Sequence, residues 1–260
     1  MSAVATSSAV ETIIEMRGVT VGSMRDPELP VVDDVNWTMT RGEFWVIGGL
    51  QGSGKTDFLT MTAGLMAPIG GCYRLFNEEM PIFEDDRLHE RLRLGFVFEN
   101  GQLFNHLTIA ENISLPLRYH RNLTKAQAEV DTRRMLELTE LAPWADTTPG
   151  ALARNWQRRV GLARALMLKP EVLLVDNPLG GLDLRHRAWW MRFLDELSRG
   201  HDWLERRPLT LVVTTSDLRL WRGQKRQFAV LRSKHFTVLG GWEQVEGAQD
   251  EFVQELLRTV

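Results

Sequence analysis

One eight-residue segment of the chain has the composition of a phosphate-binding loop. Residues 49–56 read Gly-Leu-Gln-Gly-Ser-Gly-Lys-Thr, a full match to the pattern G-x-x-x-x-G-K-[ST]. The glycines let such a loop curl until its backbone N–H groups point at a phosphate. Lys55 is expected to reach the β- and γ-phosphates, and the Thr56 hydroxyl to bind Mg²⁺. The candidate nucleotide-binding residues of this segment are Gly49, Gly52, Ser53, Gly54, Lys55, Thr56 and Asp57.

The segments on both sides of the loop are those that a phosphate site needs. Residues 44–48 read FWVIG and predict a strand, whereas residues 55–65 carry apolar residues at helical spacing. The N-terminus of a helix at this point adds partial positive charge to the phosphate site. Asp57 suits the dipole of that first turn but competes with phosphate for the same N–H groups, so we expect it to weaken binding without abolishing it.

The composition excludes several classes of protein. The 260 residues carry a formal charge of −3, with 43% hydrophobic and 25% charged residues, which fits a folded globular protein and argues against a dedicated nucleic-acid binder. The single cysteine, Cys72, excludes an internal disulfide framework. No apolar run approaches the roughly 20 residues that cross a bilayer. Residues 1–10 lack the features of a secretory signal and predict a disordered tail, so we expect a cytoplasmic protein.

The pattern of apolar residues predicts an α/β fold. Short alternating runs within residues 12–49 predict antiparallel strands and hence a second, smaller sheet. The later strand candidates are short apolar runs at 94–98, 172–176 and 209–215. The helix candidates in this part of the chain lie at about 101–141, 152–168 and 185–199, with a hairpin at 227–238 and a final helix at 243–257. This alternation implies a mostly parallel core sheet with helices on both faces.

Several segments, in this order, resemble the ATP-binding cassette of ABC transporters, over nearly the whole chain. They are the phosphate loop, LGFVFENGQLFNHLTIAENISLPLRYH (94–120) at the Q-loop, LARNWQRRVGLARAL (152–166) at the signature helix, VLLVDNPLGGLD (172–183) at Walker B and the D-loop, and LTLVVTTSD (209–217) at the switch strand. The resemblance implies one cassette over residues 11–260, with an N-terminal antiparallel β subdomain and a helical subdomain at about 101–168. Within the family, 94–120 is most similar to Mla/MCE-type lipid-transport ATPases.

The resemblance also assigns the metal side of the site. Asp176 stands at the Walker B position and would bind Mg²⁺ together with Thr56. Glu99 stands at the Q-loop position, where the family has glutamine, and its carboxylate can still ligate Mg²⁺. The alternatives are a strand-capping carboxylate for Asp176 and a solvated loop charge for Glu99. Asp183 fits either a D-loop residue or a helix N-cap.

The groups that the family uses for hydrolysis are replaced. Asn177 stands at the general-base position, and an amide cannot take a proton from water; loss of a general base costs about 10²–10⁴ in rate. Ser216 stands at the switch histidine. The signature reads LARNW at 152–156 where the family has LSGGQ, so the serine and both glycines that bind the partner's γ-phosphate are missing. Arg154 can instead offer a positive charge to that phosphate.

These matches and departures together predict a nucleotide-binding subunit of a transport complex, with lipid as the expected cargo. It would bind ATP and Mg²⁺ but hydrolyse ATP weakly or not at all. The expected partners are membrane permease subunits at the cytoplasmic face of the inner membrane and a second cassette in a homodimer or heterodimer, without nucleic acid. The alternative is an active ATPase motor with non-standard residues. A soluble ABC protein acting on DNA or ribosomes, or a P-loop kinase, fits the single compact cassette less well.

Two sets of residues suggest contacts with partners. Trp156 lies in the altered signature, and Trp189 and Trp190 follow the D-loop, so we expect some of the nine tryptophans at a subunit interface. Candidates for the permease contact, for which a core role is equally open, are Phe104, Leu107, Leu115, Leu117 and Tyr119. The pairs Arg133-Arg134 and Arg158-Arg159 are expected on solvated helix faces.

Overall fold

The computed structural model describes residues 11–80, 88–223 and 225–258, so the tail expected at 1–10 lies outside the described residues. Its strands form one ten-stranded sheet in the order β5-β4-β1-β2-β10-β9-β3-β8-β7-β6. The strands are β1 Thr12–Gly22, β2 Pro30–Thr40, β3 Phe44–Gly48, β4 Gly70–Leu75, β5 Glu78–Glu79, β6 Leu94–Val97, β7 Val172–Val175, β8 Thr210–Thr215, β9 Arg226–Arg232 and β10 His235–Gly240.

The sheet has a parallel part and an antiparallel part. Strands β9, β3, β8, β7 and β6 run parallel, whereas β1 pairs antiparallel with β2 and β4. The expected second, smaller sheet is wrong as a separate unit, because β2 joins β10 through the pair of His235 with Asp33. The predicted hairpin is confirmed by β9 and β10, which turn at Ser233 and Lys234, both at positive φ. The α/β architecture with a mostly parallel core is therefore confirmed.

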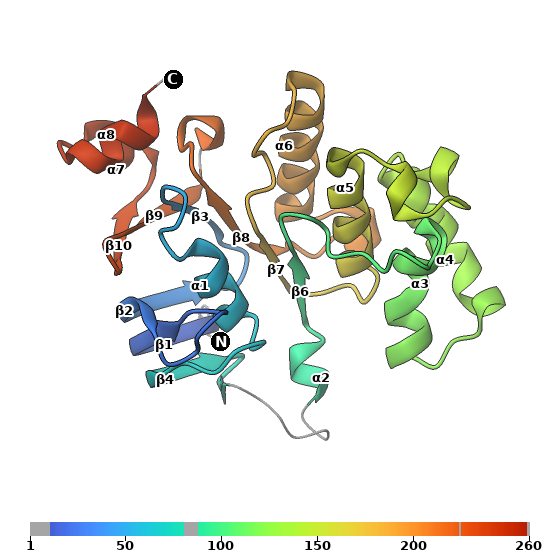
Figure 1. The fold of residues 1–260 in the computed structure, drawn as a ribbon, viewed down its shortest axis with the longest axis horizontal. Helices are drawn as coiled ribbons and strands as arrows, with labels where there is room; N and C mark the ends of the chain where they lie inside the picture. Colours follow the sequence, from blue (N-terminus) through green and yellow to red (C-terminus); the bar gives the residue numbers. More distant parts are fainter. Residues whose placement is uncertain (1–10, 81–87, 224, 259–260) are drawn as a thin grey trace, which may run out of the picture.

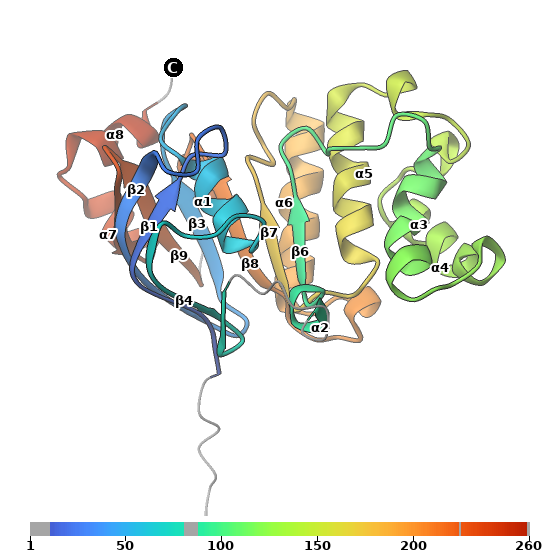
Figure 2. The same cartoon turned by 60° about the horizontal axis from the view of Figure 1, so that its bottom comes forward.

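The helices lie on both sides of the parallel strands and at one end of the molecule (Figures 1 and 2). They are α1 Lys55–Thr62, α2 Leu88–Arg91, α3 Ile109–His120, α4 Lys125–Leu138, α5 Arg154–Leu166, α6 Leu184–Arg199, α7 Trp242–Gly247 and α8 Glu251–Leu257. Short 3₁₀ turns lie at Ala142–Trp144, Pro149–Ala151, Asp202–Leu204 and Arg219–Trp221. Figure 1 shows α3 and α4 far from α7 and α8, so the helical segment after β6 forms a distinct end of the molecule.

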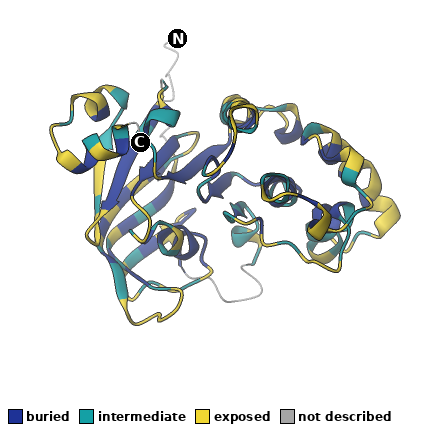
Figure 3. Ribbon diagram, turned by 45° about the horizontal axis from the view of Figure 1, so that its top comes forward, coloured by how far each residue is buried: buried dark blue, intermediate teal, exposed yellow. Residues whose placement is uncertain are grey.

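The central strands separate two hydrophobic cores because their successive side chains point to opposite faces. Leu173 and Val175 of β7 belong to the core shared with α3–α6, whereas Val172 and Leu174 belong to the core shared with α1 and the antiparallel strands. All four residues of β7 are buried. Figure 3 shows the strands as the most buried part of the fold and the outer helices as the most exposed.

Local sequence signals account for several helix ends. Thr124 caps α4 as predicted, since its Oγ1 accepts a hydrogen bond from Gln127 N at 3.3 Å. The single helix expected at 243–257 is instead two helices, α7 and α8. Ala248 is extended, and Asp250 Oδ1 accepts from the N–H groups of Phe252 and Val253 at 2.9 and 3.1 Å. The first helix thus ends before the extended Ala248, and the Asp250 cap begins the second.

The interface predicted for Trp189 and Trp190 is wrong, because both side chains are buried inside this chain at 5% and 0% exposure. Both lie on the apolar face of α6. Trp156 is half-buried, and its ring packs against Trp144 at a centroid distance of 4.3 Å. Of the candidates for a permease contact, Phe104 and Tyr119 are exposed, whereas Leu117 belongs to the core. Within the described ranges, no helix is long and apolar enough to cross a membrane.

The burial of Trp190 makes it a test of this packing. Trp190→Ala should lower the free energy of unfolding by about 3–5 kcal/mol, because it removes a fully buried ring and leaves a cavity. Val130→Ala, on the exposed face of α4, is the matched control and should change it by less than about 0.5 kcal/mol. Urea denaturation followed by circular dichroism measures both. A loss below 1 kcal/mol for Trp190→Ala would contradict the structure.

Candidate functional site

The predicted phosphate loop lies where four neighbouring parallel strands end. β3 leads into the loop at Gly49, and Glu99, Asp176 and Ser216 follow β6, β7 and β8. Because parallel strands place their carboxyl ends at one edge of a sheet, these side chains meet there. They line one cavity of about 350 Å³ with Gln51, Gly52, Gly54, Lys55, Thr56, Asp57 and Asn177. The structure therefore brings together the residues that the sequence assigned to phosphate, metal and hydrolysis.

The loop conformation depends on two of its glycines. Gly52 has φ 81° and Gly54 has φ 87°, the left-handed region that residues with a Cβ rarely adopt. Gly54 is the residue before α1, so the left-handed turn aims the first N–H groups of the helix at the cavity. Lys55 Nζ donates to the carbonyl oxygens of Gly49 at 2.6 Å and Leu50 at 2.8 Å. Burial lowers the pKa of Lys55, and the nearby carboxylates of Asp176 and Glu99 oppose this shift.

Asp176 is the centre of the hydrogen-bond network. Thr56 Oγ1 donates to its Oδ2 and Thr214 Oγ1 to its Oδ1, both at 2.7 Å. The carboxylate is 3% exposed, and burial raises its pKa, although both hydroxyl donors act in the opposite direction. The sequence prediction did not include Thr214. The signal was present, because Thr214 is a polar residue that follows the apolar run Leu211-Val212-Val213 within a fully buried strand.

Asn177 and Glu99 form a direct contact across the cavity. Asn177 Nδ2 donates to Glu99 Oε1 at 2.6 Å, and Asn177 N donates to Thr214 Oγ1 at 2.9 Å. Asn177 has φ 44°, a left-handed conformation that asparagine tolerates better than most residues. Ser216 is exposed at the rim of the same cavity. Asp57 Oδ1 accepts from Met24 N at 2.7 Å, so this carboxylate fastens the β1–β2 loop to α1, a role that the sequence did not predict.

Arg158 was expected on a solvated helix face, and this is wrong. It is 7% exposed and lies on α5 behind the cavity. Its Nε donates to the carbonyl oxygen of Glu99 at 2.7 Å. Its Nη1 donates to the carbonyl oxygens of Pro178 and Gly180, both at 3.0 Å, and of Asn177 at 3.3 Å. One guanidinium thus holds the segments after β6 and β7 at a fixed separation.

Arg159 is also buried, at 1% exposure, and explains the aromatic residues near the altered signature. Its guanidinium lies 4.5 Å from the ring centroid of Trp156 and 3.8 Å from that of Trp189, within cation–π range. Its Nη1 forms an ion pair with Glu140 Oε2 at 2.8 Å. These tryptophans are therefore used to bury a cation within the chain.

The segment in the signature position lies beside the D-loop. Ala153 precedes α5 and makes no side-chain cap, while Arg154 is exposed. Asn155 Nδ2 lies 2.5 Å from His186 Nε2. Asp183 Oδ1 accepts from His186 N at 2.9 Å, so Asp183 is the N-cap of α6. Arg154, Asn155 and Asp183 line a second cavity that shares Glu99, Asn177 and Ser216 with the first.

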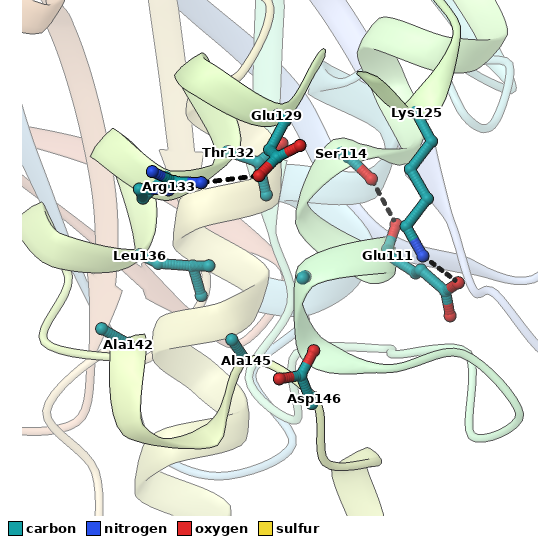
Figure 4. A pocket seen from close by; sticks show the side chains of 11 residues that line it. Glu111, Ser114, Lys125, Glu129, Thr132, Arg133, Leu136, Ala142, Ala145 and Asp146 are labelled. Atoms are coloured by element: carbon teal, nitrogen blue, oxygen red, sulfur yellow. Dashed lines mark hydrogen bonds and ion pairs between the residues drawn. The ribbon is translucent and has the colours of Figure 1, made fainter. Parts of the chain in front are cut away.

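The helical end of the molecule contains another cavity, of about 400 Å³, between α3, α4 and Ala142–Trp144 (Figure 4). Four of its charged side chains pair with each other, Glu111 with Lys125 at 3.4 Å and Glu129 with Arg133 at 2.6 Å. No residue of the phosphate loop lines it. The chemistry expected from the sequence therefore lies in the cavity at the strand ends.

The donor set of that cavity fits Mg²⁺. Thr56 and Asp176 supply a hydroxyl and a carboxylate, which are hard oxygen ligands, and their hydrogen bond shows that the two groups meet. Across the described ranges, no cluster of three or more His, Cys, Asp or Glu side chains could hold a metal ion. Mg²⁺ at nucleotide sites is usually held by one or two protein oxygens together with substrate phosphates.

Comparisons with known proteins agree with this geometry. The model of the ABC transporter family matches residues 32–180. The sulfate/thiosulfate import ATP-binding protein CysA of Gloeobacter violaceus is 37% identical over 174 residues, which cover 65% of this chain and 49% of that protein. The spermidine/putrescine import ATP-binding protein PotA of Trichodesmium erythraeum is 32% identical over 230 residues, which cover 87% of this chain and 57% of that protein. The chain spans about half the length of these curated relatives.

A solved structure shows the same fold. The ATP-binding cassette MJ0796, in a dimeric post-hydrolysis state bound to ADP and Pi, superposes with a TM-score of 0.75 at 28% identity and covers 88% of this chain and 100% of that chain. The relatives named above are importers of sulfate or thiosulfate and of polyamines. The expected similarity to Mla/MCE-type lipid-transport ATPases is not supported by them.

The buried carboxylate of Asp176 has a measurable effect on stability. The pKa of Asp176 is raised in the folded state. Above about pH 3.9, the pKa of an unfolded aspartate, the unfolded chain therefore releases this proton more readily than the folded chain, which lowers the free energy of unfolding. Asp176→Asn removes this penalty. We expect the variant to be more stable at neutral pH, on the order of 1 kcal/mol, and the difference to vanish below about pH 3.9.

Urea denaturation from pH 3 to 8 measures this difference. Asp146→Asn, an exposed aspartate outside the cavity, is the control and should match the unmodified chain throughout. The free energy of unfolding of Asp176→Asn is compared with that of the unmodified chain at each pH. If this difference is less favourable to the variant at pH 7 than at pH 4, the buried charge is net stabilising.

Proposed function

Because the chain belongs to the ABC transporter family, we propose that it binds ATP with Mg²⁺ in the cavity at the strand ends and hydrolyses ATP slowly, as the nucleotide-binding subunit of a transport complex. The observation that supports this proposal is that two sides of the cavity carry different kinds of side chain. Lys55, Thr56 and Asp176 line one side, and the hydrogen bond between Thr56 and Asp176 supports phosphate and metal binding there. Asn177 and Ser216 occupy the side that would activate water, and neither side chain can act as a strong base.

The residues of the cavity have distinct roles in this proposal. The N–H groups of Gly49, Gly52, Ser53 and Gly54 and the start of α1 bind the phosphates, and Lys55 adds its charge. Bound Mg²⁺ would neutralise phosphate charge and orient the γ-phosphate. Thr56 and Asp176 would hold the ion through their oxygens. Lys55 must leave its carbonyl partners to reach a phosphate, so phosphate competes with two short hydrogen bonds of the loop.

Partners and location follow from the family as further parts of the proposal. The chain would dimerise with a second cassette and dock on membrane permease subunits at the cytoplasmic face of the inner membrane. The exposed side chains of Phe104 and Tyr119 at the helical end suit the permease contact. The relatives are named as importers of sulfate or thiosulfate, polyamines and Fe(3+) ions, so lipid as cargo is not part of the proposal.

Nucleotide binding and phosphate release test the proposal on the purified full chain. Mg²⁺ with a fluorescent ATP analogue should bind, and Lys55→Ala should weaken binding about tenfold or more. Lys125→Ala, a lysine on α4 outside the cavity, should leave binding unchanged. Phosphate release should stay at or below about 0.1 s⁻¹, since a typical enzyme turns over near 10 s⁻¹ and a missing general base costs at least about 100-fold. Turnover near 10 s⁻¹ would support the active-motor alternative, and an absence of binding would refute the proposal.

Purification from membranes tests the expected partners. The tagged full chain, extracted in mild detergent and analysed by mass spectrometry, should carry a membrane permease subunit in stoichiometric amount. Recovery of a second, different cassette would establish a heterodimer, and recovery of this cassette alone a homodimer. A chain that purifies without any membrane protein, while still binding nucleotide, would contradict the proposed complex but leave nucleotide binding intact.

A further inference from the structure

A carboxylate that the metal site does not require faces the phosphate-loop cavity with one oxygen free. Glu99 lies two residues after β6 and lines the cavity with Lys55, Asp176 and Ser216. Its Oε1 accepts a hydrogen bond from Asn177 Nδ2 at 2.6 Å. Within the part of the chain that the structure describes, its Oε2 accepts no hydrogen bond. The cavity therefore contains an acceptor that is held at one oxygen and open at the other.

The position of this carboxylate is set by groups outside the metal site. Arg158 donates to the carbonyl oxygens of both Glu99 and Asn177, and Thr214 accepts from the N–H of Asn177. Both partners of the hydrogen bond between Glu99 and Asn177 are thus fixed through their own backbones. A catalytic group held in this way loses little conformational freedom when substrate binds.

The other two carboxylates of the cavity bind groups on its other sides. Both oxygens of Asp176 accept threonine hydroxyls on the metal side, and Asp57 is bound to the β1–β2 loop through Met24. Glu99 has no ion pair within 4 Å among the described residues, and its one partner is a neutral amide. Glu99 Oε2, which has no hydrogen-bond partner among the described residues, is therefore available to a water molecule in the cavity.

We propose that Glu99 is the catalytic residue that accepts the proton of the attacking water, and that Asn177 orients its carboxylate. The proposal rests on the proposed binding of ATP and explains how slow hydrolysis can continue without a base at position 177. The water oxygen bonds to the γ-phosphorus, and the bond from that phosphorus to the β,γ-bridging oxygen breaks with its electron pair staying on ADP. One water proton moves to Glu99 Oε2, which later releases it to solvent.

The critical variant is Glu99→Gln, because an amide keeps the shape and can still accept from Asn177 or ligate Mg²⁺ through its oxygen but cannot take a proton. Single-turnover hydrolysis of radiolabelled ATP by the purified full chain, at saturating Mg²⁺, should slow about 100-fold or more, while the Kd for the ATP analogue stays within about threefold. Glu129→Gln on α4 is the matched carboxylate-to-amide control and should hydrolyse ATP at the unmodified rate.

A second variant separates catalysis from misfolding. Glu99→Gln combined with Asn177→Glu moves the carboxylate to the other side of the same hydrogen bond and should recover most of the lost rate. A folded double variant that binds nucleotide without recovering the rate counts against the proposal.

Three results would overturn the role of Glu99. A rate for Glu99→Gln within about threefold of the unmodified chain would show that Glu99 takes no proton. A lost rate that returns when Mg²⁺ is raised would make Glu99 a metal ligand instead. If the unmodified chain binds nucleotide but hydrolyses ATP no faster than Lys55→Ala does, there is no catalysed hydrolysis in which Glu99 could act. The first two results leave the proposed function standing, whereas a failure to bind nucleotide would overturn the proposed function itself.

Discussion

The buried carboxylate of Asp176 is the group on which the rest of the site depends. A carboxylate out of water is costly unless hydrogen bonds satisfy it, and here the donors are two threonines from different elements. Thr56 belongs to the first turn of α1, and Thr214 to β8. These two bonds require α1 and β8 to sit at fixed positions beside the end of β7. The phosphate loop, which ends at α1, is thereby held at the same edge of the sheet.

Arg158 stabilises the same edge of the sheet through a second set of hydrogen bonds. Arg158 crosses from α5 to the carbonyl oxygens after β6 and β7, so four backbone groups depend on one side chain. Such carbonyl groups would otherwise need water or ligand as partners. Burial lowers the pKa of Arg158, but an arginine stays charged at any physiological pH. The fold has thus placed a permanent cation behind the cavity, where it opposes the negative charge of Glu99 and Asp176.

The sequence predicted the elements around the phosphate loop well because their signals are local. A glycine-rich loop between a strand and a helix, and the buried runs that form β7 and β8, depend on residues next to each other in the chain. Contacts between distant segments could not be predicted. The pairing of β2 with β10 joins residues 33 and 235, and the burial of Arg158 and Arg159 depends on segments up to 59 residues away, such as Glu99. A pair of arginines on a helix gives no local sign of which backbone groups it will meet.

The replaced residues show that the chemistry of a site cannot be predicted from each sequence position alone. At position 177 an amide replaces a carboxylate, and taken alone this predicts loss of the base. In the structure the amide of Asn177 is bonded to the carboxylate of Glu99, so the cavity still contains an amide and a carboxylate at hydrogen-bond distance. What decides whether water can be activated is the set of groups that face the cavity and the partners of each, because a proton acceptor acts through its geometry and its free oxygen. Two of the nine tryptophans, Trp156 and Trp189, pack against the buried guanidinium of Arg159, a contact that composition alone could not predict.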